Sequence, residues 1–290
     1  MKLNRTSVGF LLAFGSAATG AVRYNFAVYA RKLGLEYVPF LFFALVVGVS
    51  CCAVHVMARD GARGFVPLRG NWRHALLYGV LMAWGTLSHF LALNYLNETV
   101  MSSLAQTSIL LTIALAVWLL GERFTWREAL ATLVICAGIF LFRPWDVGNL
   151  KGFLVLMGGV VGTSLATVGA KRWVVGVPPR VMMVWRNTVA LAVVGAWWLS
   201  HQVPLVVTWK AALACLAAGV FGPYLHGLFF LQALQRIDAA KASLMNRVQP
   251  AIIFLVSWAF LARLPELRDG ISAALLVVGT MGLVLAHRAR

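Results

Sequence analysis

Charged residues are scarce in this sequence, and acidic residues are the scarcest of all. Only 9 of the 290 residues are Asp or Glu, and the four charged residue types together make up 12% of the chain. A soluble domain carries about 25% charged residues. The deficit excludes a water-soluble fold, and the 61% share of hydrophobic residues excludes an intrinsically disordered chain.

Cysteine is scarce as well, and several catalytic motifs are missing. No CxxC pair occurs, which excludes the usual disulfide frameworks and structural zinc sites. The absence of a Walker motif excludes ATP as the direct energy source. Paired carboxylates, a histidine metal cluster and a nucleophile with its base are also not visible, so we predict no cofactor and no metal, and a membrane enzyme is only a remote alternative. The four cysteines lie in apolar runs, at Cys51, Cys52, Cys136 and Cys215.

The sequence is rich in long apolar runs, with a mean hydropathy of +0.84. A transmembrane helix needs about 20 such residues. Helices are expected because backbone groups in lipid must be satisfied within the segment, and the runs lack the alternation of a β-barrel strand. We predict ten transmembrane helices, at residues 8–29, 36–57, 73–95, 99–120, 127–143, 151–171, 180–200, 209–233, 239–262 and 268–287.

Basic residues outnumber acidic ones by 25 to 9. We expect no nucleic-acid partner, because no basic and aromatic domain stands apart from the apolar runs. With the N-terminus placed inside, the inner segments hold fifteen basic residues and the outer segments seven. Because cytoplasmic loops collect Lys and Arg, this count predicts that both termini are cytoplasmic, in a plasma membrane such as a bacterial inner membrane.

The two halves of the chain resemble each other at an offset of 141 residues. Ser102 then falls on Ser243, and Gly138 falls on Gly279. We therefore divide the chain into residues 1–145 and 146–290, with five helices each. An odd number of helices makes the second copy enter the membrane from the opposite face, so the repeats are inverted. This arrangement is typical of transporters that alternate access around a central site.

Two segments carry a resemblance to a known family. Residues 92–142 and 233–285 resemble the EamA-type repeat of the drug/metabolite transporter superfamily, with Gly121-Glu122 and Thr125 at the helix break and Pro250 at a frequent proline position. The second copy departs from the pattern, with Ala262-Arg263 at the break. The resemblance implies an all-α integral membrane protein with ten transmembrane helices in two inverted five-helix repeats. It further implies a central cavity for small organic solutes, and bacterial members are often exporters.

The ionisable residues deep inside the predicted spans are all basic: Arg23, His89, Arg186, His226 and Arg247. All nine acidic residues fall at helix ends or in loops. An arginine at depth needs an anion or carbonyl groups around it. We therefore hypothesise that the substrate supplies a carboxylate or a phosphate, which a guanidinium group binds through two parallel hydrogen bonds.

Arg247 is the strongest candidate, because it lies near the middle of its span and its repeat mate, Gln106, is also polar. For Arg23, which precedes Tyr24, a cavity position and snorkelling to the outer headgroups are equally compatible. Arg186 lies closer to the predicted inner edge of its span, where we expect snorkelling or a structural contact.

Two histidines occupy helices that are repeat mates, and each is compatible with either packing or lining the cavity. Nearby aromatic residues could form stacking walls. The predicted substrate-binding residues are Arg247, Gln106, Arg23, His89, His226, Trp84, Tyr224 and Tyr24.

These features predict a secondary transporter that exports an amino acid or another metabolite bearing a carboxylate or a phosphate. Its partners would be the lipid bilayer and a small anionic or zwitterionic substrate. A flippase for a lipid-linked or phospho-headgroup substrate is the alternative. The sequence does not distinguish proton coupling through the histidines from exchange, and it gives no oligomeric state.

Overall fold

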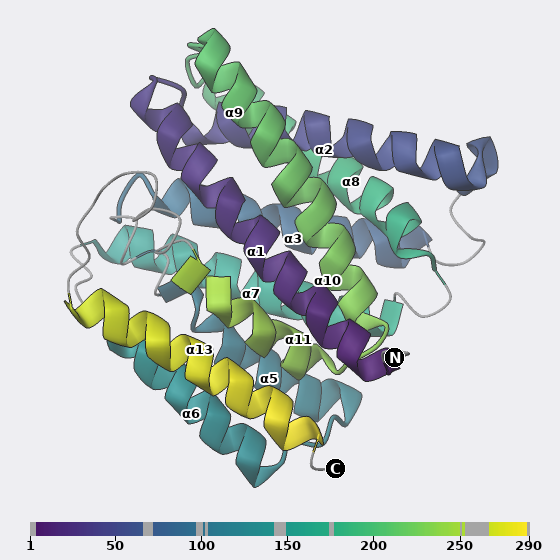
Figure 1. Cartoon of the computed structure of the whole chain (residues 1–290). Helices are drawn as coiled ribbons and strands as arrows, with labels where there is room; N and C mark the ends of the chain where they lie inside the picture. The colour runs from purple at the N-terminus through teal and green to yellow at the C-terminus, as the bar shows by residue number, and fades with distance from the viewer. Residues whose placement is uncertain are drawn as a thin grey trace.

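Each of the ten predicted spans contains helix in the computed structural model. The structure describes residues 4–65, 72–96, 101, 104–141, 149–173, 177–249, 251–252 and 267–288, and no strand occurs within these ranges. Pro250 and the predicted boundary between residues 145 and 146 lie outside the described residues. The first repeat contains α1 (Arg5–Lys32), α2 (Tyr37–Asp60), the short η1 (Ala62–Phe65), α3 (Trp72–Ala92), α5 (Ser108–Leu120) and α6 (Trp126–Leu141), as Figure 1 shows.

The second repeat is helical in the same way. Among the described residues, five helical segments are long and apolar enough to cross a membrane, and two further apolar helices are shorter. The fold is therefore that of an all-α membrane protein. The second repeat contains α7 (Leu150–Trp173), α8 (Pro179–His201), α9 (Trp209–Gly219), η2 (Val220–His226), α10 (Gly227–Leu234), α11 (Ala239–Met245), η3 (Asn246–Val248) and α13 (Leu267–Arg288).

The break between α5 and α6 follows from its sequence. Gly121 ends α5 with φ +65°, in the left-handed region that glycine adopts without strain. The backbone N–H of Thr125 then donates to Glu128 Oε2 at 2.8 Å, and the N–H of Glu128 donates to Thr125 Oγ1 at 3.4 Å. This reciprocal pair is a capping box, which satisfies backbone donors at the start of α6.

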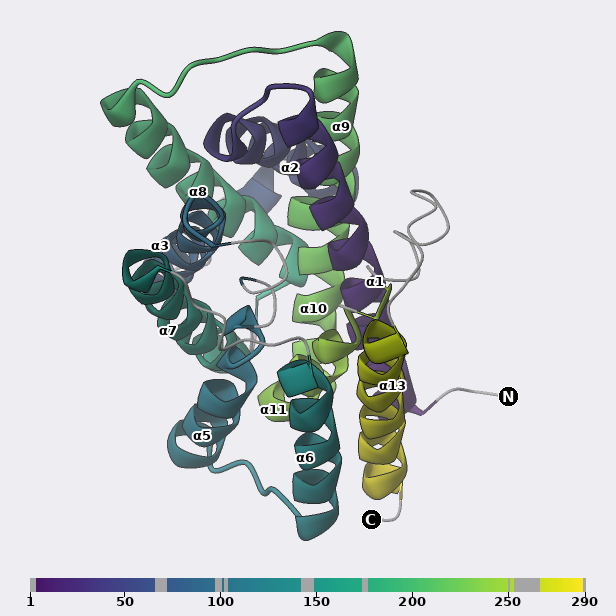
Figure 2. The same cartoon turned by 90° about the vertical axis from the view of Figure 1, so that its left-hand side faces the viewer.

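The two repeats are inverted relative to each other. Arg5, at the start of α1, donates to the carbonyl of Gln235 at 3.2 Å, and Lys171, near the end of α7, donates to the carbonyl of Leu234 at 2.6 Å. The beginning of α1 and the end of α7 therefore lie at the same end of the molecule. These helices open the two repeats, so they run antiparallel. Figure 2 shows that the start of α1 and the end of α13 also share this end.

Helices of the two repeats are interlaced in space. The first helix of the first repeat, α1, packs along α9 and α10 of the second, whereas its mate α7 packs along α3 of the first repeat. The mates α2 and α8 contact each other, and so do α6 and α13, which lie side by side in Figures 1 and 2. The walls of the molecule thus combine both repeats.

The contact between α6 and α13 contains residues that are related by the repeat. A Cβ atom added at Gly279 would lie 3.0 Å from the carbonyl oxygen of Ala131 and 2.6 Å from Ile135 Cγ1. At Gly138 it would lie 3.1 Å from the carbonyl oxygen of Ser272. Both glycines therefore allow close approach of the two helices. Since equivalent residues meet here, a local two-fold axis passes through this interface.

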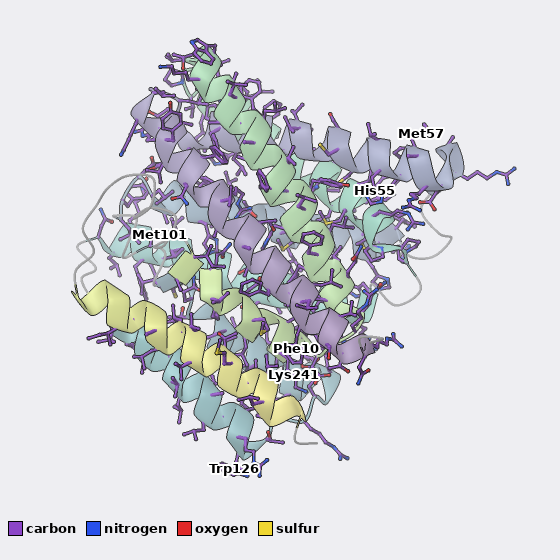
Figure 3. All side chains as sticks on the ribbon, viewed as in Figure 1. Phe10, His55, Met57, Met101, Trp126 and Lys241 are labelled. Carbon is purple, nitrogen blue, oxygen red and sulfur yellow. The ribbon has the colours of Figure 1, made fainter. Side chains whose placement is uncertain are left out.

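Charged side chains join the repeats at the end of the bundle near the start of α1. Lys241 on α11 is 2% exposed and lies 3.4 Å from Glu128 Oε1 on α6, which is fully buried. Lys241 also pairs with Asp238. Glu122 accepts the N–H groups of Ala239 at 2.7 Å and Ala240 at 3.1 Å, at the first turn of α11. We call Glu122, Glu128, Asp238 and Lys241 the inter-repeat charge network, of which Lys241 is labelled in Figure 3.

We predict that Lys241→Ala destabilises the protein by about 3–5 kcal/mol, because it removes a buried cation that lies beside the buried carboxylate of Glu128. Thermal unfolding of the purified protein in detergent measures the effect. The control is Lys210→Ala, whose side chain lies over the exposed Trp209 ring and should change little. Replacing the pair together, as Glu128→Gln with Lys241→Met, should recover much of the loss. An unchanged melting temperature for Lys241→Ala would contradict the assignment.

We also predict that Gly279→Ala lowers stability by about 1–3 kcal/mol, since the added carbon meets backbone on α6 that cannot move aside. Gly270→Ala on the same helix is the matched control. Its Cβ has no neighbour within 4 Å, and replacing a helical glycine should raise stability by up to about 1 kcal/mol. Equal melting temperatures for the two variants would argue against close packing of α6 on α13.

Candidate functional site

A cavity of about 180 Å³ lies at the centre of the bundle. It is smaller than the pockets of about 300–1,000 Å³ that hold drug-sized ligands, which points to a small occupant. Helices from both repeats contribute to its wall. The polar and charged lining residues are Arg23, Thr86, His89, Gln106, Ser108, Thr163, Thr167, Arg186, Asn187, His226, Ser243, Asn246, Arg247 and Gln249.

Arg247 and Gln106, the pair of repeat mates, lie together in the cavity wall. Arg247 Nη1 donates to Gln106 Oε1 at 2.6 Å, and Nη2 donates to the hydroxyls of Ser108 and Ser243, each at 3.1 Å. Gln106, Ser108 and Ser243 therefore help to orient the guanidinium. As equivalent residues of the two repeats bond to each other, this contact lies on the local two-fold axis.

Arg186 is buried in the cavity wall and makes structural contacts, which was one of the two expectations for it; it does not snorkel to the membrane surface. It is 7% exposed, and its Nε and Nη2 donate to Asn187 Oδ1 at 3.0 and 2.8 Å. Asn187 is fully buried and donates to the carbonyl of Pro223 at 2.9 Å. The distance of Arg186 from the helix end does not by itself predict this burial, because the network of neutral acceptors holds the charged side chain inside.

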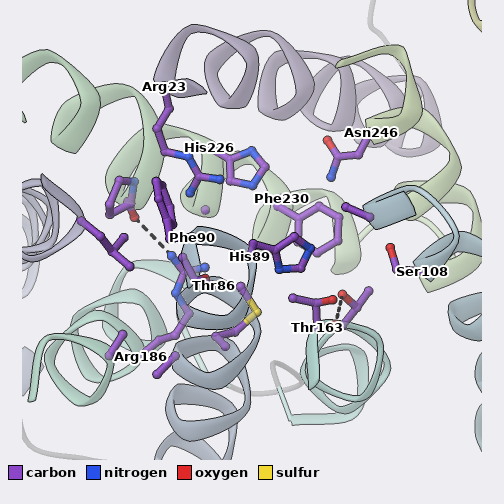
Figure 4. A pocket seen from close by; sticks show the side chains of 18 of the residues that line it. Arg23, Thr86, His89, Phe90, Ser108, Thr163, Arg186, His226, Phe230 and Asn246 are labelled. Atoms are coloured by element: carbon purple, nitrogen blue, oxygen red, sulfur yellow. Dashed lines mark hydrogen bonds between the residues drawn. The ribbon is translucent and has the colours of Figure 1, made fainter. Parts of the chain in front are cut away.

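The segment that supplies this carbonyl is a π-helix, η2, with Pro223 inside it. Proline has no N–H to donate, so it interrupts the regular hydrogen-bond ladder, and π-turns often occur at functional sites. Gly222 in the same turn allows Arg23 to pass closely: a Cβ there would lie 2.2 Å from Arg23 Cδ. Arg23 consequently lines the cavity and extends toward His226, as Figure 4 shows.

Both predicted histidines also line the cavity. His226 Nδ1 lies 2.8 Å from the carbonyl oxygen of Ser16 on α1, and His89 Nδ1 lies 2.5 Å from the carbonyl oxygen of Gly85. The His226 ring stacks against Phe230, with ring centroids 6.4 Å apart. Figure 4 labels His89, His226 and Phe230 among the residues that line the pocket.

The structure does not bring Trp84 and Tyr224 into the cavity. Trp84 is 56% exposed, and its Nε1 donates to the carbonyl of Gly158 on α7. The residues of α3 that line the cavity, among them Ala83, Thr86 and Phe90, form one stripe of the helix, and Trp84 falls outside it. Tyr224 instead contacts His55 Nδ1 through its hydroxyl, at 3.0 Å.

The last predicted residue, Tyr24, is not placed, because its side chain lies outside the described residues.

Three polar residues that line the cavity were not predicted from the sequence: Asn187, Ser108 and Thr163. A polar residue next to an arginine within an apolar run, as in Arg186-Asn187, is a signal that could have identified Asn187. Ser108 and Thr163 lack such a signal, because serine and threonine are common in membrane helices, where they bond to their own backbone.

The cavity is strongly positive. Three arginines line it, whereas the described lining contains neither Asp nor Glu. Part of the wall is apolar, formed by side chains such as Leu41, Leu45, Phe90, Val194 and Phe230. Within the described residues no group of three His, Cys, Asp or Glu side chains lies close enough together to hold a metal ion. The arrangement can therefore bind an anionic group through arginine and an organic body through apolar contacts.

Comparison with known proteins agrees with the fold. The model of the EamA-like transporter family matches residues 7–143 and 150–285, which correspond to the two repeats. A solved structure titled "Crystal structure of protein" has a TM-score of 0.81 and 20% sequence identity to this chain, and the match covers 98% of each. That likeness shows the fold alone. No curated protein sequence matches significantly. The chain belongs to the EamA-like transporter family, and it is a membrane transporter of the drug/metabolite transporter superfamily.

Proposed function

We propose that this transporter exports a small organic anion, bearing a carboxylate or a phosphate, by alternating access around the central cavity. The observation that carries the proposal is the convergence of Arg23, Arg186 and Arg247, from three different helices, on one small cavity. Three positive charges in a site of low dielectric attract an anion far more strongly than they would in water.

The hydrogen bonds around these arginines favour an anionic substrate over a neutral one. Arg186 bonds to the amide oxygen of Asn187, and Arg247 bonds to an amide and two hydroxyls. Such acceptors orient a guanidinium group but do not cancel its charge. The described lining contains no carboxylate, so its positive field can attract an anionic ligand, and bidentate binding of a carboxylate or a phosphate suits the planar fork of arginine.

The apolar part of the wall favours an organic anion over an inorganic one. Phe90 and Phe230 lie beside the polar lining and offer surfaces for a hydrocarbon or aromatic group. A cavity of about 180 Å³ suits a metabolite of a few carbon atoms. An amino acid would place its carboxylate on arginine, although the positive lining favours substrates with net negative charge.

We infer that the end of the bundle with both termini faces the cytoplasm of a bacterial cell. The inferred inner segments carry fifteen basic residues against seven on the outer ones. The inter-repeat charge network lies at this end, joining α6 to α11.

Transport assays in proteoliposomes test the proposal with radiolabelled benzoate, succinate, glutamate and glycerol 3-phosphate, and with glucose as a neutral control. We expect transport of at least one anion and none of glucose. Arg247→Ala should raise the KM for that anion about 10- to 100-fold, since a hydrogen bond to a charged group contributes about 1.5–3 kcal/mol. Arg127→Ala, next to the exposed Trp126, is the control. Unaltered kinetics in Arg247→Ala would remove Arg247 from the site.

The packing of Arg23 gives a second prediction. Gly222→Ala should weaken transport of the same anion about tenfold, because the new carbon displaces the Arg23 side chain, which lies 2.2 Å from its position. Gly158→Ala is the matched control, since its Cβ would meet Trp84 at an ordinary 3.7 Å. Expression and melting temperature are measured for both variants. If Gly222→Ala folds and transports normally, Arg23 does not contribute to binding.

A further inference from the structure

In each of the two cavity histidines, the ring nitrogen Nδ1 lies within hydrogen-bond distance of a backbone carbonyl oxygen. His226 Nδ1 lies 2.8 Å from the carbonyl oxygen of Ser16 and 3.0 Å from Ser16 Oγ. The Ser16 hydroxyl itself donates to the carbonyl of His226, at 3.0 Å. The hydroxyl hydrogen of Ser16 is engaged in that bond, so the hydroxyl oxygen and the carbonyl oxygen of Ser16, which both face His226 Nδ1, act as acceptors. Nδ1 must therefore carry a hydrogen.

His89 is fixed in the same way by a different contact. Its Nδ1 lies 2.5 Å from the carbonyl oxygen of Gly85, one turn earlier on α3. A carbonyl oxygen can only accept, so this Nδ1 also carries a hydrogen. In a neutral imidazole only one nitrogen is protonated. Both rings thus present the lone pair of Nε2, and both belong to the lining of the central cavity.

The lone pair of Nε2 in a neutral ring is unfavourable next to an anion, because it repels the oxygen atoms of a carboxylate or a phosphate. Once Nε2 takes up a proton, the same atom becomes a charged donor to that oxygen. The step forms one N–H bond at Nε2, and the proton comes from solvent. Anion binding and proton binding at these rings therefore favour each other.

The charges around the two rings strengthen this coupling. Arg23 on α1 and Arg186 on α8 act on His226, while Arg23 and Arg247 act on His89. Among the described residues, Ser16, Gly20 and Phe230 beside His226, and Gly85 and Gly159 beside His89, are neutral. In the empty cavity a further positive charge beside two arginines is unfavourable. An anion offsets this repulsion, so a proton enters with the anion rather than alone.

We propose that His89 and His226 form a proton site in the transport cavity, where Nε2 of one ring takes up a proton when the anion binds and releases it when the anion leaves. The protein would then move one proton together with each anion. The inference rests on the proposed function, because it assigns the coupling ion of the same site.

The first test determines the tautomers without any transported substrate. Nitrogen NMR of the full-length protein, with ¹⁵N-labelled histidine, distinguishes a protonated Nδ1 from a protonated Nε2. His89→Asn and His226→Asn assign the signals, and each keeps an N–H close to the position of Nδ1. At about pH 8, we expect both rings to be neutral with hydrogen on Nδ1. A hydrogen on Nε2 in both rings would overturn the proposal.

The second test measures the coupling itself. Proteoliposomes containing a fluorescent pH indicator are given succinate, or another anion of the panel that the protein transports, at values between about pH 6 and pH 8. We expect protons to move with the anion, and the apparent affinity to rise about tenfold for each unit that the pH falls. The double variant His89→Asn with His226→Asn should transport with less than about twofold pH dependence. His201→Asn, at the exposed end of α8, is the control and should behave like the unmodified protein.

The outcomes separate the two hypotheses. If anions move without protons, or if the double variant keeps the full pH dependence, the histidines are not the proton site and the transporter assignment stands. If none of the anions moves while the protein is folded, the proposed function fails, and the proton site fails with it.

Discussion

The central constraint on this molecule is that a positive charge inside a membrane protein needs acceptors around it. The structure meets this need in two ways. Lys241 is surrounded by carboxylates, Glu128 and Asp238, so its charge is balanced within the protein. The described contacts of Arg186 and Arg247 include amides, hydroxyls and a carbonyl, which orient a guanidinium group. The first arrangement holds helices together, and the second orients positive groups in the wall of the cavity.

The repeat explains how the polar and charged residues come to line one cavity. At an offset of 141, Arg247 corresponds to Gln106 and Arg186 corresponds to Leu45, and all four residues line the cavity. The helices are equivalent in position, but the two copies carry different side chains at the axis. Symmetry therefore supplies a cavity with two related walls, and divergence between the copies supplies its positive charge, with Arg23 in the first copy and Arg186 and Arg247 in the second. An anion can bind in one preferred orientation because the two ends of such a cavity are not alike.

Periodicity and the repeat were sufficient to predict the helices and their inversion, because both depend on helix length or on the offset alone. The offset also placed Arg247 and Gln106 at equivalent positions, but the hydrogen bond between them is seen only in the structure. The direction of a side chain around its helix was harder to predict. Trp84 lies near His89 in the sequence, yet it falls outside the stripe that faces the cavity. The Glu128–Lys241 pair was missed for another reason. Both residues lie near helix ends, where solvent exposure is the usual expectation, but these ends meet inside the bundle.

Interlacing of the repeats limits the motions that can alternate access. If residues 1–145 moved as one body against residues 146–290, the long contacts of α1 with α10 and of α3 with α7 would have to slide. At α3 and α7 the backbones approach too closely for that: a Cβ at Gly159 would lie 3.0 Å from the carbonyl oxygen of Gly85. Close packing of this kind is bistable rather than continuously deformable. Under the proposed alternating access, the bodies that move are therefore better taken as α1 with α9 and α10, and α3 with α7, each drawn from both repeats. Bending at the π-turn around Pro223 would then move Asn187 and Arg186 with it, since both bond to that carbonyl, and so would connect the cavity charge to the motion.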